Sequence, residues 1–403
     1  MKHIMSGKRG SYTVFIAIFM SGMIIMAGAV INASHRMAID SAAEDLGNLW
    51  ANSIIGEYDI KLRERYGFYG YYGNGDMVRE KLDSYADYTF RGKKYIKRSE
   101  ISCDLENYRL SDPDVFRDQM GKIILSLWKP IPFEDDEPSD ISEGTVSNDT
   151  VRYISSGWIL EGLPSHSRSK KVSGGGMSLM ETAYIFKSFK DHVDDRDLGK
   201  TYFKNEIEYI ITGKPDDEKA RKGVYLRLLG ERNALNLAYL YGSPEKRNAA
   251  LEAAELITPG PQAFVTQAVI LEVWALLESR NDIELLYDGE RVPLVKGDDN
   301  WALGLESAVE KVSDDEEEGE LDTRETRKYV RPKSIEGLKY SDYLKSILIT
   351  VPENKRLLRV MDLIQINMKF AYCDYFLLDD YYTGLDYSMT VNGTKHDYHA
   401  KYD

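Results

Sequence analysis

The stretch YTVFIAIFMSGMIIMAGAVI, residues 12–31, decides the architecture of this chain. It holds no ionisable side chain except the phenol of its first residue. A helix of this length rises about 30 Å, which is the thickness of the hydrocarbon core of a bilayer. The basic residues Lys2, Lys8 and Arg9 come before it, and cations there favour a cytoplasmic amino terminus. We therefore predict a basic cytoplasmic head at residues 1–11, a single-pass transmembrane helix at residues 12–31, and an extracytoplasmic remainder.

A cleaved secretory signal is the alternative interpretation of the same stretch. Ala27, Gly28 and Ala29 are small residues at the spacing that signal peptidase uses. However, the apolar stretch is long for a signal core, and no turn-forming cluster follows it. Beyond Asn32, apolar or small residues continue at helical spacing along one side. We expect one helix from about residue 12 to about residue 65, whose second part must pack on something.

Composition limits the class of protein. A chain of 403 residues leaves enough after the span for one large or two moderate domains with a real core. Its 43% hydrophobic and 29% charged residues are ordinary for a globular protein. The formal charge of −14 argues against a nucleic-acid partner, because binding to phosphates needs a clustered cationic face.

The fold class that we predict is α+β and predominantly α, with small β-hairpin elements. Residues 32–129 would form a helical stalk and the first part of the extracytoplasmic domain. Residues 130–176 hold an acidic loop and a Gly/Ser-rich loop, and residues 177–403 form the main helical part. Within that part we expect a charged loop at 311–335 and a C-terminal hairpin at 385–403 that turns at an Asn-Gly pair.

Three local patterns give sharper predictions. Apolar residues alternate with polar ones around Cys103, which predicts a half-buried strand. Asp288 and Gly289 lie between two short apolar runs, which predicts another hairpin turn. Arg359 and Asp362 lie three residues apart on an apolar helix, a spacing that lets them form a structural ion pair.

Signatures of enzymes and of metal sites are missing from the sequence. It contains no HExxH, GxSxG, Walker phosphate loop or CxxC pair. Glycines 174–176 precede a helix without the Lys-Ser/Thr that would complete a phosphate loop, so a hinge is favoured. His396 and His399 would face opposite sides of a strand, and the acidic run 314–322 lacks calcium-loop spacing. We expect no enzyme activity, no cofactor and no metal.

Cys103 and Cys373 are the two cysteines of the chain. In an exported protein they could form one long-range disulfide. Two separate buried thiols are the alternative, which we favour because one pair of cysteines does not make a disulfide framework.

Six segments carry a likeness to known sequences when they are taken jointly. They are GSYTVFIAIFM (10–20), EYDIKLRERYGFYGY (57–71), FKNEIEYIITGK (203–214), WALLESRNDIELL (274–286), YSDYLKSILI (340–349) and RVMDLIQIN (359–367). They resemble a Gram-positive family of unknown function whose genes accompany those for the Tad pilus (Flp-type, type IVc). The resemblance implies a pilin-like or pseudopilin-like membrane protein of the cell envelope that works with a Tad secretion machine. Its partners would be the membrane and, through the N-terminal helix, pilins or other Tad components, while any small-molecule ligand is unknown.

The resemblance also implies roles for residues of the N-terminal helix. Small residues would let this helix approach sister helices closely in the membrane. They are Ser21, Gly22, Ala27, Gly28 and Ala29. Prepilins of this broad class are cleaved after a Gly that is followed by Glu at the fifth mature position, and here the cleavage would fall between Gly10 and Ser11. The fifth residue would then be Phe15. This departure favours an accessory or minor component that stays in the membrane or caps an assembly.

A membrane-anchored adhesin or receptor is the alternative function. In that case the loops at 130–150 and 165–176 would display the binding surface. Loss of an assembly factor would abolish surface pili, whereas loss of an adhesin would weaken only attachment. A cell-envelope enzyme is a distant third choice.

Overall fold

The computed structural model describes residues 7–93, 95–127, 175–313 and 329–402. Most of the predicted basic head, most of the loops at 130–176 and much of the charged loop at 311–335 lie outside these residues. The chain forms two compact units. The first unit comprises Met1–Arg63, Tyr69–Val115 and Asp379–Asp403, and the second comprises Glu64–Phe68 and Phe116–Leu378.

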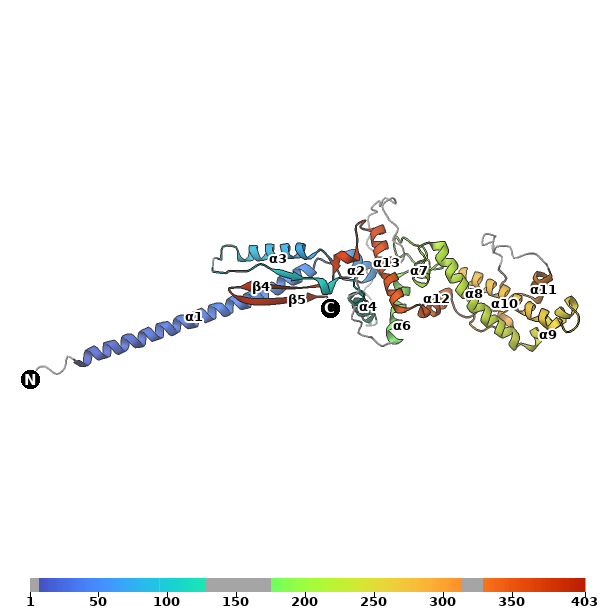
Figure 1. Ribbon diagram of the computed structural model, residues 1–403, viewed down its shortest axis with the longest axis horizontal. Helices are drawn as coiled ribbons and strands as arrows, with labels where there is room; N and C mark the ends of the chain where they lie inside the picture. The colour runs from blue at the N-terminus through green and yellow to red at the C-terminus, as the bar shows by residue number, and fades with distance from the viewer. Residues whose placement is uncertain (1–6, 94, 128–174, 314–328, 403) are drawn as a thin grey trace, which may run out of the picture. The chain divides into compact units, whose positions relative to one another are not determined.

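A single helix, α1 (Gly7–Ile55), is the longest element of the first unit (Figure 1). It ends about ten residues earlier than we predicted, and a separate short helix, α2 (Ile60–Tyr66), follows. The reason is local. The amides of Gly56 and Glu57 close the last turn, and Tyr58 then leaves the helix to form an antiparallel bridge with Tyr71.

The first unit also contains two small antiparallel sheets. Strands β2 (Ser102–Asp104), β4 (Gly384–Val391) and β5 (Thr394–Lys401) form one sheet with β4 in the middle, and β1 (Tyr71–Tyr72) pairs with β3 (Tyr381–Tyr382) in the other. The strand predicted at Cys103 and the C-terminal hairpin are therefore confirmed. Asn392 and Gly393 have φ values of 49° and 91°, as a two-residue hairpin turn requires.

The core of the first unit lies between the second part of α1, helix α3 (Gly75–Phe90) and the three-stranded sheet. Trp50 of α1 packs edge-on against Phe90 of α3 with ring centroids 5.8 Å apart. Ala43, Ala51 and Ile54 are buried on the same side of α1. The amphipathic pattern that we predicted after the apolar stretch thus marks the face that packs.

The second unit is helical in the part that the structure describes. Its helices are α4 (Pro113–Leu127, whose first turn belongs to the first unit), α6 (Gly175–Ser188), α7 (Glu206–Thr212), α8 (Asp217–Gly242), α9 (Pro244–Ile257), α10 (Ala263–Tyr287), α11 (Leu305–Ser313), α12 (Tyr340–Thr350) and α13 (Glu353–Ala371). Side-chain caps determine where α8 and α9 begin. Asp216 accepts a hydrogen bond from the Lys219 amide at the start of α8, and Ser243 accepts one from the Lys246 amide at the start of α9. The chain is thus predominantly α with small antiparallel sheets, as predicted.

The hairpin predicted at Asp288 and Gly289 is wrong, because these residues terminate α10. Gly289 has a φ of 82°, its amide donates to Leu286, and the Glu290 amide donates to Leu285. This is the pattern of a helix end closed by a left-handed glycine. Val292 then pairs with Leu338 in an isolated bridge.

The units also divide the chain differently from the boundaries drawn on the sequence. The hairpin at 385–403 was grouped with the helical region 177–403, but it packs with α1 in the first unit. The two ends of the chain therefore build one unit, and the second unit lies between them in the sequence.

Candidate functional site

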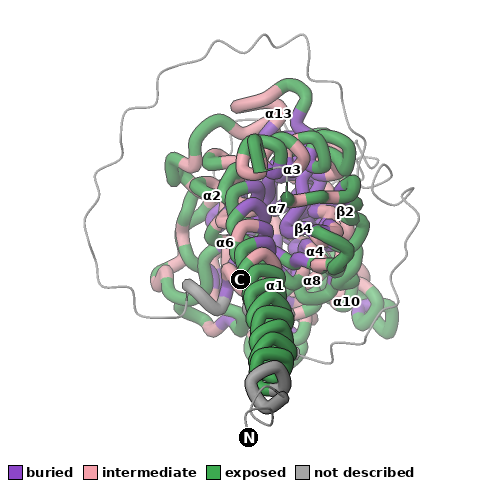
Figure 2. The backbone as a smooth tube through the Cα atoms, turned by 90° about the vertical axis from the view of Figure 1, so that its left-hand side faces the viewer, coloured by how far each residue is buried: buried purple, intermediate pink, exposed green. Residues whose placement is uncertain are grey.

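The first part of α1 is the most unusual surface of the described chain. Every residue from Tyr12 to Ala38 is exposed, although most of the side chains up to Ile31 are apolar (Figure 2). Among the described helices, α1 is the one that is long and apolar enough to cross a membrane. An exposed apolar surface of this extent is unstable in water and needs lipid or protein to cover it.

Tyrosine hydroxyl groups hold the second part of α1 on the three-stranded sheet, and we call this contact the seat of α1. Tyr398 donates to the carbonyl of Ala43 at 3.0 Å, and Tyr387 donates to the carbonyl of Gly47 at 2.7 Å. Tyr402 donates to the carbonyl of Ile55. Burial raises the pKa of Tyr398 to about 12 and also raises the pKa of Tyr387, so both stay protonated donors. These bonds fix the helix in register on β4 and β5.

Gly47 lets the helix and the sheet come this close. A methyl group on Gly47 would lie 2.1 Å from the ring of Tyr398, which is far inside van der Waals contact. The Tyr387 and Tyr398 rings stack behind it with centroids 4.5 Å apart. The seat therefore depends on a missing side chain on α1 and on two aromatic residues of the hairpin.

The residues predicted to act in the membrane all lie on the exposed part of α1. Ser21 donates its hydroxyl to the Ile18 carbonyl at 2.8 Å, within its own helix. Gly22 and Gly28 have open space where a Cβ would be. Ala27 and Ala29 are exposed beside them. The backbone of Gly10 and Ser11, the predicted cleavage point, belongs to α1, but the side chain of Ser11 lies outside the described ones.

Both cysteines are free thiols in the structure. Cys103 is half-buried on β2, and burial together with Asp104 and Asp386 raises the pKa of its thiol to about 11. A thiol with that pKa is protonated at neutral pH and is a poor nucleophile. Cys373 is half-buried just beyond α13. Cys103 therefore lacks the lowered thiol pKa of a catalytic cysteine.

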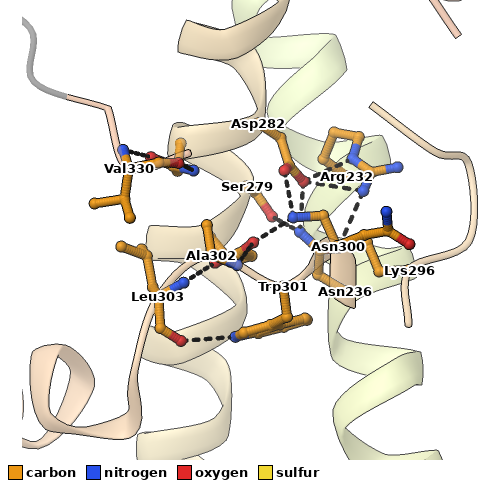
Figure 3. A network of polar contacts seen from close by, with 12 residues as sticks. Arg232, Asn236, Ser279, Asp282, Lys296, Asn300, Trp301, Ala302, Leu303 and Val330 are labelled. Atoms are coloured by element: carbon orange, nitrogen blue, oxygen red, sulfur yellow. Dashed lines mark hydrogen bonds and ion pairs between the residues drawn. The ribbon is translucent and has the colours of Figure 1, made fainter. Parts of the chain in front are cut away.

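The second unit holds a buried polar network that could be mistaken for an active site (Figure 3). Arg232 of α8 donates to Asp282 of α10 at 2.9 Å, and Lys296 lies 2.5 Å from the other oxygen of the same carboxylate. Lys296 also pairs with Glu278, which accepts from the amides of Ala302 and Leu303 at 2.9 Å. These four charged side chains are 0–1% exposed, and their charges cancel. The network therefore fastens the segment after α10 to the helices and offers no charge to a substrate.

Helix α7 carries two carboxyl groups with no exposed surface, Glu206 and Glu208. Asn367 donates to Glu206 at 2.6 Å, and Tyr340 donates to Glu208 at 2.8 Å. Burial raises the pKa of each carboxyl group to about 7. A shifted pKa of this kind is a sign of catalysis only where a ligand has access, so we assign both groups to the packing of α7.

Arg359 and Asp362 both contact α7, and the ion pair predicted between them stays a prediction. The Arg359 guanidinium donates to the carbonyls of Ile210 and Ile211, and Asp362 accepts from the Tyr209 hydroxyl. Arg359 thereby places a cation at the C-terminus of α7, where the helix dipole favours it.

Metal-binding clusters are not found among the described residues. His399 lies 2.7 Å from Asp386, and His396 faces Asp40 at 3.7 Å. The two histidines thus contact different elements, β4 and α1, as expected for opposite faces of β5.

Sequence reasoning missed the seat of α1. Tyr387, Tyr398 and Tyr402 lie within the predicted hairpin at 385–403, but their partners lie some 350 residues earlier in the chain. The alternation of tyrosines in that hairpin was the one visible signal. It predicts a buried face without saying which element covers it.

Comparison with known proteins gives one match. Residues 116–393 match a family described as a family of unknown function (DUF5702). The matched stretch begins in α4 and ends in the turn between β4 and β5, so α1 lies outside it. No curated protein and no solved structure matches the chain at a significant level.

Proposed function

The chain belongs to DUF5702, a family of unknown function, and we propose that it works as a membrane-anchored, pilin-like assembly component of a Tad-type pilus or secretion machine. In this role α1 crosses the cell membrane once with its amino terminus in the cytoplasm, and the rest of the chain is extracytoplasmic. The protein acts structurally and not as an enzyme.

One observation carries the proposal: a single helix has an exposed apolar first part and a second part seated on a sheet. The first part, Tyr12 to about Ile31, needs lipid or sister helices around it. The second part is tied to β4 and β5 through the hydroxyl groups of Tyr387 and Tyr398. A subunit built in this way can exchange lipid for helix contacts around its first part while its folded unit stays intact.

The small residues in the first part of α1 form a surface on which another helix could pack in place of lipid. Helices associate in membranes mainly through close packing, and small residues let the backbones approach. A Cβ on Gly22 or on Gly28 would have nothing within 4 Å in this chain. They are therefore available to another helix.

The test is complementation of a strain that lacks the gene. We expect the deletion to abolish surface pili and the wild-type gene to restore them. A Gly22→Leu, Gly28→Leu variant should reach the membrane in normal amount and fail to restore pili, because bulky side chains hold sister helices apart. The matched control, Ile24→Leu with Ile31→Leu, should restore them. Intact pili with weakened attachment after deletion would contradict the proposal and support an adhesin.

Mapping of the mature amino terminus tests the processing step separately. If a prepilin peptidase acts, the protein extracted from membranes starts at Ser11. A chain that still starts at Met1 would exclude this cleavage and would leave a permanently anchored accessory component. A start soon after Ala29 would instead identify a cleaved signal and would overturn the anchoring.

A further inference from the structure

An open groove lies on the second unit where α7, α8, α12 and α13 meet. Its volume is about 660 Å³, within the range of sites that hold a ligand or an anchoring side chain. Leu226, Ile347 and Val351 give it apolar walls. Leu226 is 54% exposed, so part of this apolar surface is in contact with water.

Two of the three cationic side chains at the groove have no partners in the described chain. Arg227 and Lys355 line it, are exposed, and form no hydrogen bond or ion pair with any residue that the structure describes. Glu231, one helical turn after Arg227, also lacks such a partner there. With Arg359, which donates to carbonyls of α7, three cations and one carboxylate thus border an apolar surface in a chain whose net charge is −14. A binding partner for this groove should be apolar and mainly acidic.

The turn between α9 and α10 presents a surface of that kind, which we call the tip. Its large apolar side chains are exposed: Leu256 by 86%, Phe264 by 65% and Val265 by 68%. A hydrogen bond of 2.6 Å between the hydroxyl groups of Thr258 and Thr266 holds the end of α9 beside the first turn of α10. These side chains therefore form one projection.

The tip also carries the opposite charge. Glu252 and Glu255 are exposed on the last turns of α9, and neither pairs with a residue in the described part of the chain. The tip includes the N-terminal end of α10, where the helix dipole is positive, and this suits Glu231 of the groove. The two surfaces are complementary in polarity and in the sign of their charges.

The groove and the tip lie apart along α8. Arg232 lies opposite Asp282 and Asn236 lies opposite Ser279, so α8 and α10 run antiparallel. The start of α10 is therefore at the C-terminal end of α8 (Figure 1), whereas the groove is lined by residues from the middle of α8. From Glu231 to the end of α8 at Gly242 the helix rises about 16 Å. This separation keeps a chain from placing its own tip in its own groove.

We propose that the tip of one copy docks in the groove of a second copy, so that the protein associates head to tail through its helical unit. Leu256 and Phe264 enter between the apolar walls, Glu252 and Glu255 meet Arg227 and Lys355, and Glu231 meets the start of α10. Two different surfaces take part, so the contact is heterologous and leaves a free groove and a free tip at the ends of every assembly. The inference stands independently of the membrane proposal, because it involves only α7 to α13.

The experiment uses the full-length chain in lipid nanodiscs loaded with one copy each, which prevents contacts between transmembrane helices. Sedimentation velocity of wild type should show growing species as concentration rises, in roughly the micromolar range because the contact is small. Arg227→Glu with Lys355→Glu, or Leu256→Asp with Val265→Asp, should each weaken association at least tenfold. Lys219→Glu with Lys222→Glu, which makes the same charge change on α8 outside the groove, should associate like wild type.

A mixture of the two defective variants separates a head-to-tail contact from any other. One variant still has a working tip and the other a working groove, so the mixture should form dimers and stop there. Charge reversal gives a second check: Glu252→Lys with Glu255→Lys should fail alone and recover when mixed with the groove reversal. Wild type that stays single up to about 100 μM, variants that associate normally, or a mixture that forms no dimer would each overturn the proposal.

Discussion

Gly47 lies where the ring of Tyr398 crosses α1. Replacing it with alanine tests whether α1 and the sheet approach as closely as the structure shows. In an open helix Gly→Ala stabilises by up to about 1 kcal/mol. In Gly47→Ala the new methyl group would meet the Tyr398 ring at 2.1 Å, so we expect a net loss of about 1–2 kcal/mol. Hydrogen exchange of the β4 and β5 amides measures this loss of stability. Gly75→Ala is the control because nothing lies within 4 Å of its Cβ, and a stabilised Gly47→Ala would contradict the close approach.

Glu206 and Glu208 predict how stability depends on pH. Burial raises the pKa of both from the ordinary value of 4.5 to about 7, so the folded chain holds protons that the unfolded chain has released. Stability from these groups is therefore fully present below pH 4.5 and is lost as the pH rises through about 7, by roughly 1–3 kcal/mol for each group. Burial raises the pKa of Asp191 too, with the same sign.

Denaturant unfolding of the second unit between pH 5 and pH 8 measures this effect. The double variant Glu206→Gln, Glu208→Gln should flatten the dependence, because an amide carries no charge at either pH. Glu218→Gln, on the exposed first turn of α8, should leave the slope as in wild type. A second unit that becomes more stable as the pH rises would show that the sign is wrong.

Single residues were predictable where their effect is local. Asn392 and Gly393 specify a hairpin turn by themselves, and the structure has it. Asp288 and Gly289 are residues of the same kind. A glycine with a positive φ can end a helix as well as form a hairpin turn, and here it ends α10. Arg359 also donates to the carbonyls at the end of α7, a contact that its spacing from Asp362 does not predict. Short-range spacing cannot foresee a partner that tertiary packing brings near.

At the scale of the element, α1 combines an apolar membrane-type helix with an amphipathic helix that packs on a sheet. Its apolar first part follows from composition alone, and its packed second part follows from helical periodicity. Its end at Ile55 did not follow, because Tyr58 leaves the helix for a bridge with Tyr71 that periodicity cannot show. The groove beside α8 was equally hidden in the sequence, since it needs residues of four helices.

Charges placed in the first part of α1 test the membrane role of this element. Phe19→Arg with Ile25→Arg puts two cations in the apolar stretch, each of which costs roughly 2.5–3.5 kcal/mol near the bilayer centre. We expect much of the protein to leave the membrane fraction after alkaline extraction. Asn48→Arg with Ser53→Arg adds the same charge to the exposed side of the second part and should stay in the membrane. Equal retention of both variants would contradict a transmembrane role.

At the scale of the whole molecule, the order of elements explains why the two compact units differ from the division drawn on the sequence. The second unit is nearly continuous in sequence, whereas the first is made of the start of the chain and its last 25 residues. Local patterns predicted both halves of the first unit, as a helix and as a hairpin. They could not show that the halves meet, because the contact spans more than 300 residues and was visible only in the burial of Tyr387 and Tyr398.

This topology predicts that loss of the last strand affects the first unit alone. A chain that stops after Val391 lacks β5, and with it the Tyr398 and Ala400 side chains that cover α1. We expect amides from Ala43 to Ile54 and those of β4 to lose their protection from hydrogen exchange, while α8 and α10 keep theirs. Membrane attachment should persist, because the apolar first part of α1 is untouched.

Replacement of outward-facing residues of the same strand provides the control. Lys395→Ala with Asp397→Ala alters only exposed side chains, so protection should match wild type throughout. A truncated chain that loses protection equally in α8 and α10 would show that the two units unfold together. Loss confined to α1, α3 and β4 would instead mean that the hairpin serves as the seat of α1, and that the helical unit holds its fold through its own buried network around Arg232 and Asp282.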